Sequence, residues 1–247
     1  MDKDAPTTTD ITLDWGKKIT PSHGGKGTGK PHVNETLFTT PIYQALINIY
    51  GGNVFKPEVC QPESLIETSK KVLIDQFFDL YTKSEMFQKV YLFLTQNKIV
   101  KEDGFYERLF TWWFGTYTRC HGPVGSSGFE HVFSGEHKNE IVDGHHSWVR
   151  YYLGQKAGLI EYHGYESRVA NLTGTIQYKW QGHLKLIGGF LMQTSPLFDF
   201  SLYTLCSMLQ IENGGCHFKI DEHPLSVTSF HEKCLDGVCL TTAYPSE

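Results

Sequence analysis

The sequence has no uninterrupted apolar stretch near the roughly 18 residues that a transmembrane helix requires, so we predict no membrane-spanning segment. No apolar run follows Met1, so we expect that the start is not a secretory signal peptide. We find no internal repeat. With 247 residues, 40% of them hydrophobic, the chain is long enough for one large domain or two tightly joined halves.

An excess of positive charge is also missing. The formal net charge is -5. Residues 1–120 contribute 14 basic and 14 acidic side chains, whereas residues 121–247 contribute 8 and 13. A protein that coats long nucleic acids is expected to be basic, so this one should contact few phosphates or recruit a cation.

The cysteines include no CxxC pair, which argues against a zinc ribbon. The six are Cys60, Cys120, Cys206, Cys216, Cys234 and Cys239. Their even number and two sequons, at Asn34 and Asn171, fit a secreted, disulfide-bonded glycoprotein, with a cytoplasmic protein as the alternative. Cys234 and Cys239 could close a small disulfide loop or be two buried thiols, and the spacing does not decide between these.

After a polar N-terminal segment, the chain divides into a part with helical periodicity and a part rich in predicted strands. Residues 1–36 are polar, and we predict a poorly ordered arm in which 24–30 (GGKGTGK) is a linker rather than a phosphate loop. Residues 37–120 have helical periodicity, and the predicted helices begin near Pro62, Ser84 and Phe105. Residues 121–247 form the other part of a single domain. Strands are predicted at 129–133, 175–180, 184–190, 217–220 and 225–230, helices at 146–155 and 196–210, and a surface loop between 161 and 180. The fold class is α+β.

Residues 121–152 contain five histidines, three glutamates and five glycines. Histidine changes charge near neutral pH and is the usual residue for transferring protons or binding metals. His131 lies between apolar residues, so it fits either a site or a core histidine bonded to a carbonyl. His145 and His146 follow an Asp143-Gly144 turn, and only one is expected to enter a given site, because adjacent helical residues point about 100° apart.

Two histidines and a lysine together fit the cleavage of RNA through its own 2′-hydroxyl. One histidine removes the 2′-OH proton, the oxygen attacks the phosphorus, and the other histidine protonates the departing 5′-oxygen. A lysine such as Lys185 stabilises the charge on the phosphorane. No serine or cysteine nucleophile is needed, since the nucleophile is part of the substrate.

Four ordered motifs make the chain resemble the EndoU family, the uridylate-preferring endoribonucleases of animals, which are related to a nidovirus replicase subunit. The motifs are SGFEHVFSGE at 127–136, GHHSWVRYY at 144–152, WQGHLK at 180–185 with SPLFDFSLY at 195–203, and TAY at 242–244. The resemblance implies an α+β fold with a helical N-terminal part and a β-rich catalytic half, in which two small sheets flank a cleft.

The resemblance also implies roles for individual residues. It makes His131, His146 and Lys185 catalytic, with His145 as a neighbour. Supporting or substrate-binding positions are Glu130, Glu136, Gly189, Thr242 and Tyr244. Relatives commonly have a serine where this chain has Gly189, so its uridine preference could be looser. A tyrosine ring can stack on a pyrimidine or its ribose, and a threonine hydroxyl can read the uracil edge.

The expected partner is single-stranded RNA, cut by a monomeric enzyme that leaves a 2′,3′-cyclic phosphate and a 5′-hydroxyl. DNA should survive because it lacks the 2′-hydroxyl. The family further implies stimulation by a divalent cation, Mn²⁺ or Ca²⁺, for which the sequence identifies no ligand set.

Two other functions fit part of the sequence. A metal-dependent hydrolase could use a cluster of acidic and imidazole side chains, namely Glu130, His131, Glu136, His137, His145 and His146. The absence of an HExxH motif argues against it, as does the lack of a role for Lys185 or Tyr244. The third hypothesis is a catalytically inactive RNA-binding or secreted interaction protein, against which the intact catalytic residues argue.

Overall fold

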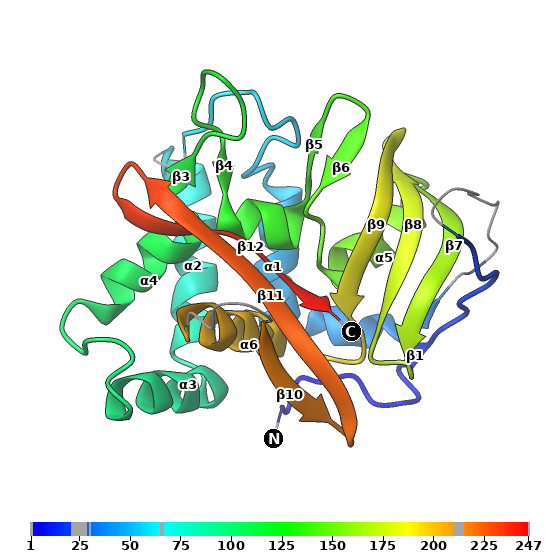
Figure 1. Cartoon of the computed structure of the whole chain (residues 1–247), viewed down its shortest axis with the longest axis horizontal. Coiled ribbons are helices and arrows are strands. Elements are labelled where there is room, and N and C mark those ends of the chain that lie inside the picture. Colours follow the sequence, from blue (N-terminus) through cyan, green and yellow to red (C-terminus); the bar gives the residue numbers. More distant parts are fainter. Residues whose placement is uncertain (1, 21–28, 30, 65–66, 210–214, 247) are drawn as a thin grey trace.

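A computed structural model describes residues 2–20, 29, 31–64, 67–209 and 215–246 (Figure 1). Four helices follow one another in the first half, and a fifth, from the second half, packs against them. They are α1 (Pro41–Gly51), α2 (Thr68–Thr82), α3 (Glu85–Gln96), α4 (Phe105–Phe114) and α6 (Pro196–Met208). A 3-10 turn, η1 (Glu35–Thr39), leads into α1. Ser84 and Ser195 cap α3 and α6 by accepting hydrogen bonds from backbone amides, which fixes where these helices begin.

Aromatic side chains join the helical part to the rest of the molecule. The Trp113 ring stacks on Phe200 at 4.9 Å between centroids, and Phe129 contacts Phe77 at 4.8 Å. The indole of Trp113 donates a 2.9 Å hydrogen bond to Thr204, which satisfies its only polar group. One continuous core therefore lies beneath both halves.

Among the described residues, the named strands form two larger sheets and two short ribbons. The five-stranded sheet has the order β5-β6-β9-β8-β7, in which only the β6–β9 pairing is parallel. Its strands are β5 (Glu136–Lys138), β6 (Ile141–Asp143), β7 (Ile160–Val169), β8 (Thr173–Trp180) and β9 (His183–Leu191). The antiparallel three-stranded sheet contains β10 (Cys216–Ile220), β11 (His223–Cys234) and β12 (Gly237–Ser246). The ribbons pair β1 (Ile11–Thr12) with β2 (His32–Val33) and β3 (Thr116–Tyr117) with β4 (Ser126–Ser127).

Strand β12 contacts β9, so the two larger sheets meet beside helix α5 (Trp148–Lys156). In Figure 1 the long β11–β12 hairpin crosses in front of the helices, and the C-terminus lies next to β9. The predicted α+β class, with a helical part and small sheets, is confirmed.

The strand predicted at 129–133 is wrong, because residues Glu130–Ser134 form a π-helical turn, η2. Phe129, Val132 and Phe133 are all buried, which is the i, i+3, i+4 spacing of a helix. The residues between them are buried as well, so the apolar spacing was mistaken for the alternation of a strand.

The surface loop predicted between 161 and 180 is also wrong. Strands β7 and β8 occupy most of it as an antiparallel hairpin. The turn lies at Ala170, whose φ of 49° is left-handed, and at the Asn171 sequon. Alternating β7 residues such as Tyr162 and Gly164 face the protein interior, which the polar residues between them hid.

Several helix boundaries differ from the prediction. Helix α2 begins at Thr68 rather than near Pro62, because residues before it are held elsewhere: the Glu63 amide bonds to the Val124 carbonyl at 3.2 Å. The helix predicted from 146 starts at Trp148, after its Ser147 cap. Position 210, the predicted end of the last helix, lies outside the described residues.

The arm predicted at 1–36 contacts the body of the protein where it is described. The indole of Trp15 donates to Asn171 at 3.1 Å, and the Ile19 amide bonds to Tyr165 at 2.8 Å. Ile11 is buried opposite Val33. The described part of the arm is therefore held against β7 and the turn after it, whereas the polarity of residues 1–36 predicted a poorly ordered segment. Of the linker 24–30, only Gly29 is described.

Four cysteines form disulfides, Cys206–Cys216 and Cys234–Cys239, which decides the alternative left open for the second pair. Cys60 and Cys120 are free thiols. Over the described ranges we find no helix with the length and hydropathy needed to cross a membrane.

Candidate active site

A cleft of about 650 Å³ opens where η2, β9 and the β11–β12 hairpin meet. It brings together residues that are up to 127 positions apart in the sequence, from Arg119 to Ser246. Six of the residues predicted for the site line it, namely His131, His146, Lys185, Gly189, Thr242 and Tyr244. The rings of His131 and His146 lie 5.9 Å apart between centroids.

Backbone hydrogen bonds fix the two histidines relative to each other. The amide of His145 bonds to the carbonyl of His131 at 2.8 Å, and that of His146 to Val132 at 2.7 Å. Gly144 makes this approach possible, because a Cβ there would lie 1.9 Å from the His131 carbonyl oxygen and its φ is 61°. A π-helical turn, which is frequent at functional sites, presents His131 to the cleft.

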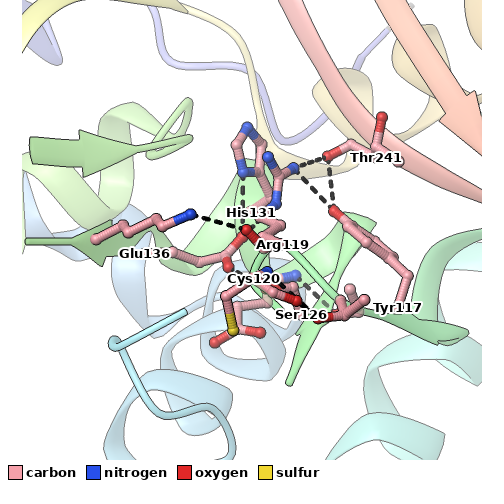
Figure 2. A network of polar contacts seen from close by, with 11 residues as sticks. Tyr117, Arg119, Cys120, Ser126, His131, Glu136 and Thr241 are labelled. Carbon is pink, nitrogen blue, oxygen red and sulfur yellow. Dashed lines mark hydrogen bonds and ion pairs between the residues drawn. The ribbon is translucent and has the colours of Figure 1, made fainter. Parts of the chain in front are cut away.

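His131 is held by a buried carboxylate. Its Nδ1 lies 3.1 Å from Glu136 Oε1, while the other Glu136 oxygen accepts a hydrogen bond from Ser126. Arg119 completes this cluster with its Nε 3.5 Å from Glu136 (Figure 2). Burial raises the pKa of Glu136 to about 7, against the opposing influence of Arg119 and Ser126. Burial, followed by the charges of Arg119 and Lys185, lowers the pKa of His131 well below the usual value.

His146 is held by a neutral partner. Its Nδ1 lies 2.7 Å from the carbonyl oxygen of Gly189, which only accepts, so Nδ1 carries the hydrogen. In the neutral ring, Nε2 is then the proton acceptor. Burial, followed by Lys185 and His131, lowers the pKa of His146 well below the usual value, so the ring is neutral at pH 7. The Tyr244 ring stacks on it at 5.1 Å.

Lys185 projects from β9 into the cleft and is only 7% exposed. Burial lowers its pKa to about 8, and nearby Asp143 acts in the opposite direction. It is therefore mostly protonated at pH 7. The neighbouring Gly188 leaves room for the lysine stem, since a Cβ there would lie 2.9 Å from its Cγ.

The base-binding positions predicted from the resemblance lie on one wall of the cleft. The hydroxyl of Thr242 is buried and has no hydrogen-bond partner among the described residues. Opposite Thr242 in the β11–β12 ladder is Phe230, which is 57% exposed and also lines the cleft. A Cβ on Gly189 would meet only backbone oxygens at 3.5 Å, so space exists for a small side chain.

Other members of the histidine–glutamate cluster lie outside the cleft. His145 is fully buried, stacked on Trp180 at 4.8 Å, with its Nδ1 against the Tyr178 hydroxyl. Glu130 is also fully buried, and its carboxylate has no hydrogen-bond partner in the described part of the chain. Burial, followed by the charges of Glu136 and Glu63, raises its pKa well above the usual value.

The six side chains proposed for a metal-dependent hydrolase are thus distributed over different places. The sixth, His137, stacks face to face on His183 at 3.8 Å. In the described ranges, no three His, Cys, Asp or Glu side chains are arranged to hold a metal ion. The residues predicted for the site therefore do not form a set of ligands for a bound metal.

Three charged residues of the cleft, Arg119, Asp143 and Glu166, were not among the predicted site residues. The Arg119 guanidinium donates to the Tyr117 hydroxyl at 2.8 Å and to the Thr241 carbonyl at 2.6 Å. Thr241 is 122 residues away in the sequence, so no local pattern marks this arginine. Asp143 was interpreted only as part of a turn. Its position directly before the GHH sequence at 144–146 could have indicated that it lies near the site.

The cleft of this α+β fold contains two imidazoles, which can transfer protons, and the positive charges of Lys185 and Arg119. These features are those of a protein with an acid–base site. Comparison with known proteins gives its family. The family model described as Endoribonuclease XendoU matches residues 1–245, and the chain belongs to that family. The identification from sequence motifs is confirmed.

Curated relatives share about a third of the sequence. The chain is 34% identical to a mouse (Mus musculus) uridylate-specific endoribonuclease over 234 residues, which are 90% of this chain and 55% of the relative. The human (Homo sapiens) protein of that name is 34% identical and covers 81% of this chain and 49% of its own length. Uridylate-specific endoribonuclease C of Xenopus laevis is 33% identical, with coverages of 87% and 76%. The chain thus spans about half the length of these mammalian relatives.

The fold matches a solved structure, that of XendoU, a splicing-independent snoRNA-processing endoribonuclease. The TM-score is 0.76, and the match covers 99% of this chain and 92% of the other. The sequence identity is 23%, so this likeness concerns the fold alone.

Proposed function

We propose that the chain is an endoribonuclease that cuts single-stranded RNA at uridylates by transesterification through the 2′-hydroxyl. The products are a 2′,3′-cyclic phosphate and a 5′-hydroxyl. The observation that carries the proposal is the pair of imidazoles 5.9 Å apart in one cleft, with Lys185 beside them. The names of the relatives support the substrate class.

In this proposal His146 is the general base. Its hydrogen bond to the Gly189 carbonyl leaves Nε2 as the acceptor, and its lowered pKa keeps that nitrogen free at neutral pH. Nε2 takes the proton of the 2′-hydroxyl as the oxygen attacks the phosphorus. The role follows from the partner of Nδ1, which selects the tautomer.

His131 is the general acid. A protonated imidazole donates from Nδ1 to Glu136 and from Nε2 to the departing 5′-oxygen. Burial disfavours this charge in the free protein, so the bound phosphodiester has a second role. Its negative charge raises the pKa of His131 and opposes the influence of Arg119 and Lys185.

Lys185 stabilises the charge that develops on the phosphorane. It is buried and mostly protonated at neutral pH, and a desolvated cation interacts strongly with that charge. Arg119 adds a second positive charge, held by Tyr117, Thr241 and Glu136. Both cations would contact one phosphate, which agrees with the acidic overall charge of a protein that does not coat RNA.

Uracil would bind between Tyr244 and Thr242. The unpartnered Thr242 hydroxyl can bond to the edge of the base, and the Tyr244 ring offers a stacking surface for the ribose or base. Gly189 has no side chain to add a further hydrogen bond. We therefore expect a preference for uridine that tolerates other pyrimidines.

We propose that Mn²⁺ or Ca²⁺ stimulates cleavage without taking part in the chemical step.

We also propose that the protein is a secreted monomer. The two disulfides support an oxidising compartment for the protein.

The deciding experiment is cleavage of a short single-stranded RNA with one uridine, beside the same strand with deoxyuridine at that position. Each is incubated with EDTA, Mn²⁺ or Ca²⁺. Cutting of the RNA alone, ending in a cyclic phosphate, supports the mechanism and shows which ion matters. Cutting of both strands would contradict it and favour metal-activated water. Cutting of neither would favour a binding protein.

A further inference from the structure

Two thiols that the proposed reaction does not use lie next to the site. Cys60 and Cys120 come from segments 60 residues apart, and the interaction of their side chains raises the pKa of Cys60. Both are partly exposed. Two cysteines whose side chains touch are in reach of a disulfide bond, provided that an oxidant reaches them.

The backbone segments that carry the two thiols also contact each other directly, apart from the contact between the two side chains. The Glu63 amide bonds to the Val124 carbonyl at 3.2 Å. A Cβ on Gly125 would lie 1.9 Å from the Gln61 carbonyl oxygen, so the two segments pack backbone to backbone. The segments that carry Cys60 and Cys120 are therefore held side by side.

Cys120 directly follows Arg119, whose guanidinium contacts Glu136 behind His131 (Figure 2). Residues 118–125 lie between β3 and β4 without regular structure. The Arg119 backbone is held through its carbonyl, which accepts a 3.0 Å hydrogen bond from Lys138. A covalent link at the next residue would restrict this segment and keep the arginine directed at Glu136.

The Cys60 segment is itself tied to β5. The Val59 amide bonds to the His137 carbonyl at 3.1 Å, and the His137 amide bonds to Pro57 at 2.6 Å. His137 directly follows Glu136 in the sequence. A bond from Cys60 to Cys120 would therefore connect both ends of the Arg119–Glu136 contact, through the new covalent link on one side and these backbone hydrogen bonds on the other.

We propose that Cys60 and Cys120 form a third disulfide, made by exchange with a small-molecule disulfide, which fixes Arg119 against Glu136. One cysteine thiolate attacks the small disulfide and releases one thiol, leaving a mixed disulfide. The second cysteine then displaces the other thiol. Two protons and two electrons pass from the cysteines to the small molecule, which is reduced to two thiols. In an oxidising compartment the bond is closed, and in a reducing one it opens.

The first test is disulfide mapping on the full chain, which needs no variant. The protein is equilibrated in buffers of oxidised and reduced glutathione, quenched in acid, alkylated and digested for mass spectrometry. We expect a peptide pair joined through Cys60 and Cys120 and no alkylated cysteine under oxidising conditions. Alkylation of Cys60 and Cys120 in samples whose Cys206–Cys216 and Cys234–Cys239 bonds are intact would overturn the proposal.

The second test is the melting temperature. The bond closes a long loop, so the C60S/C120S double variant should melt on the order of 5–10 °C below the oxidised wild-type protein. The single variants C60S and C120S should melt like the double variant, because each removes the same bond. Equal melting temperatures for the double variant and the oxidised wild type would show that the bond does not restrain the fold.

The third test is RNA cleavage, and only this arm rests on the proposed function. Oxidation of Cys60 and Cys120 should raise the cleavage rate of the wild type several-fold, whereas C60S/C120S should not respond to the glutathione ratio. A wild-type rate that is equal in both redox states would contradict the link to Arg119. If no RNA is cut in either state, the proposed function fails, while the mapping and melting experiments still decide the disulfide.

Discussion

His131 and His146 reach the same cleft from two regions that hold them with different partners. On the η2–β5 side, His131 contacts the Glu136 carboxylate, which Arg119 and Ser126 also contact. On the α5–β9 side, His146 donates to the carbonyl of Gly189. A carboxylate stabilises a protonated imidazole, whereas a single carbonyl fixes the tautomer without adding a full charge. The partner behind each ring, rather than the ring itself, therefore prepares it to give or to accept a proton.

The largest effect should come from removing either ring. His131→Ala and His146→Ala should each lower kcat/KM for RNA by roughly 1,000-fold or more, because each loses a proton-transfer group. Initial rates on the single-uridine RNA measure this, with circular dichroism as the check on folding. His217→Ala, which removes an exposed histidine of β10, is the matched control and should keep wild-type activity.

A change of leaving group should then separate the two rings. Uridine 3′-(4-nitrophenyl phosphate) releases a weakly basic phenolate that needs no general acid. On this substrate His131→Ala should recover most of its activity, and His146→Ala should stay inactive. Recovery of the His146 variant instead would reverse the assignment of base and acid.

Lys185→Ala should rank next, with a loss of roughly 100-fold, by analogy with the removal of a transition-state donor. The pKa of about 8 gives the pH dependence, because Lys185 is charged below that pH and loses its charge as the pH rises through it. The wild-type kcat/KM should therefore fall on the alkaline side near pH 8. In Lys185→Arg this limb should move to higher pH, and exposed Lys219→Ala is the control. An unchanged limb in the arginine variant would contradict the role.

Glu136→Gln should have a smaller effect, on the order of 10-fold. Glutamine keeps a similar size but removes the charge that stabilises protonated His131, so the pKa of His131 falls. The part of the alkaline fall that comes from His131 should then move to lower pH, whereas the part near pH 8 that comes from Lys185, and the acid limb, which reports His146, should not move. Glu140→Gln removes an exposed carboxylate beside β5 and is the control. Equal shifts of both limbs would mean that the two regions are not independent.

The smallest effect concerns base preference. Gly189→Ser should fold, since its Cβ meets only backbone oxygens at 3.5 Å, and its hydroxyl should raise the preference for uridine over cytidine a few-fold. Competing cleavage of two labelled RNAs measures the ratio. Gly189→Ala adds the carbon without the hydroxyl and should leave the ratio unchanged, so a similar change in both variants would exclude a hydrogen bond as the cause.

The sequence predicted the elements with a clear period and missed those defined by distant contacts. Strand β8 and helix α6 agree with their patterns, because one face of each is apolar at regular spacing. The π-helical turn at His131 was mistaken for a strand, since all of its residues are buried and no face stands out. Strand β7 was missed because polar residues separate its buried positions, and because the edge that pairs with the N-terminal arm, as at Tyr165 and Lys18, depends on a distant segment.

The sequence by itself determined the family and the identity of the catalytic candidates, because motifs such as SGFEHVFSGE keep chemical groups in a fixed local order. It also showed that the chain is acidic and rich in histidine. Only the tertiary structure decided which partner backs each ring and that Arg119 belongs to the site. These outcomes depend on contacts such as His146 to Gly189 and Arg119 to Thr241. Burial and pairing set the charge of each group, and both arise only when distant segments pack together.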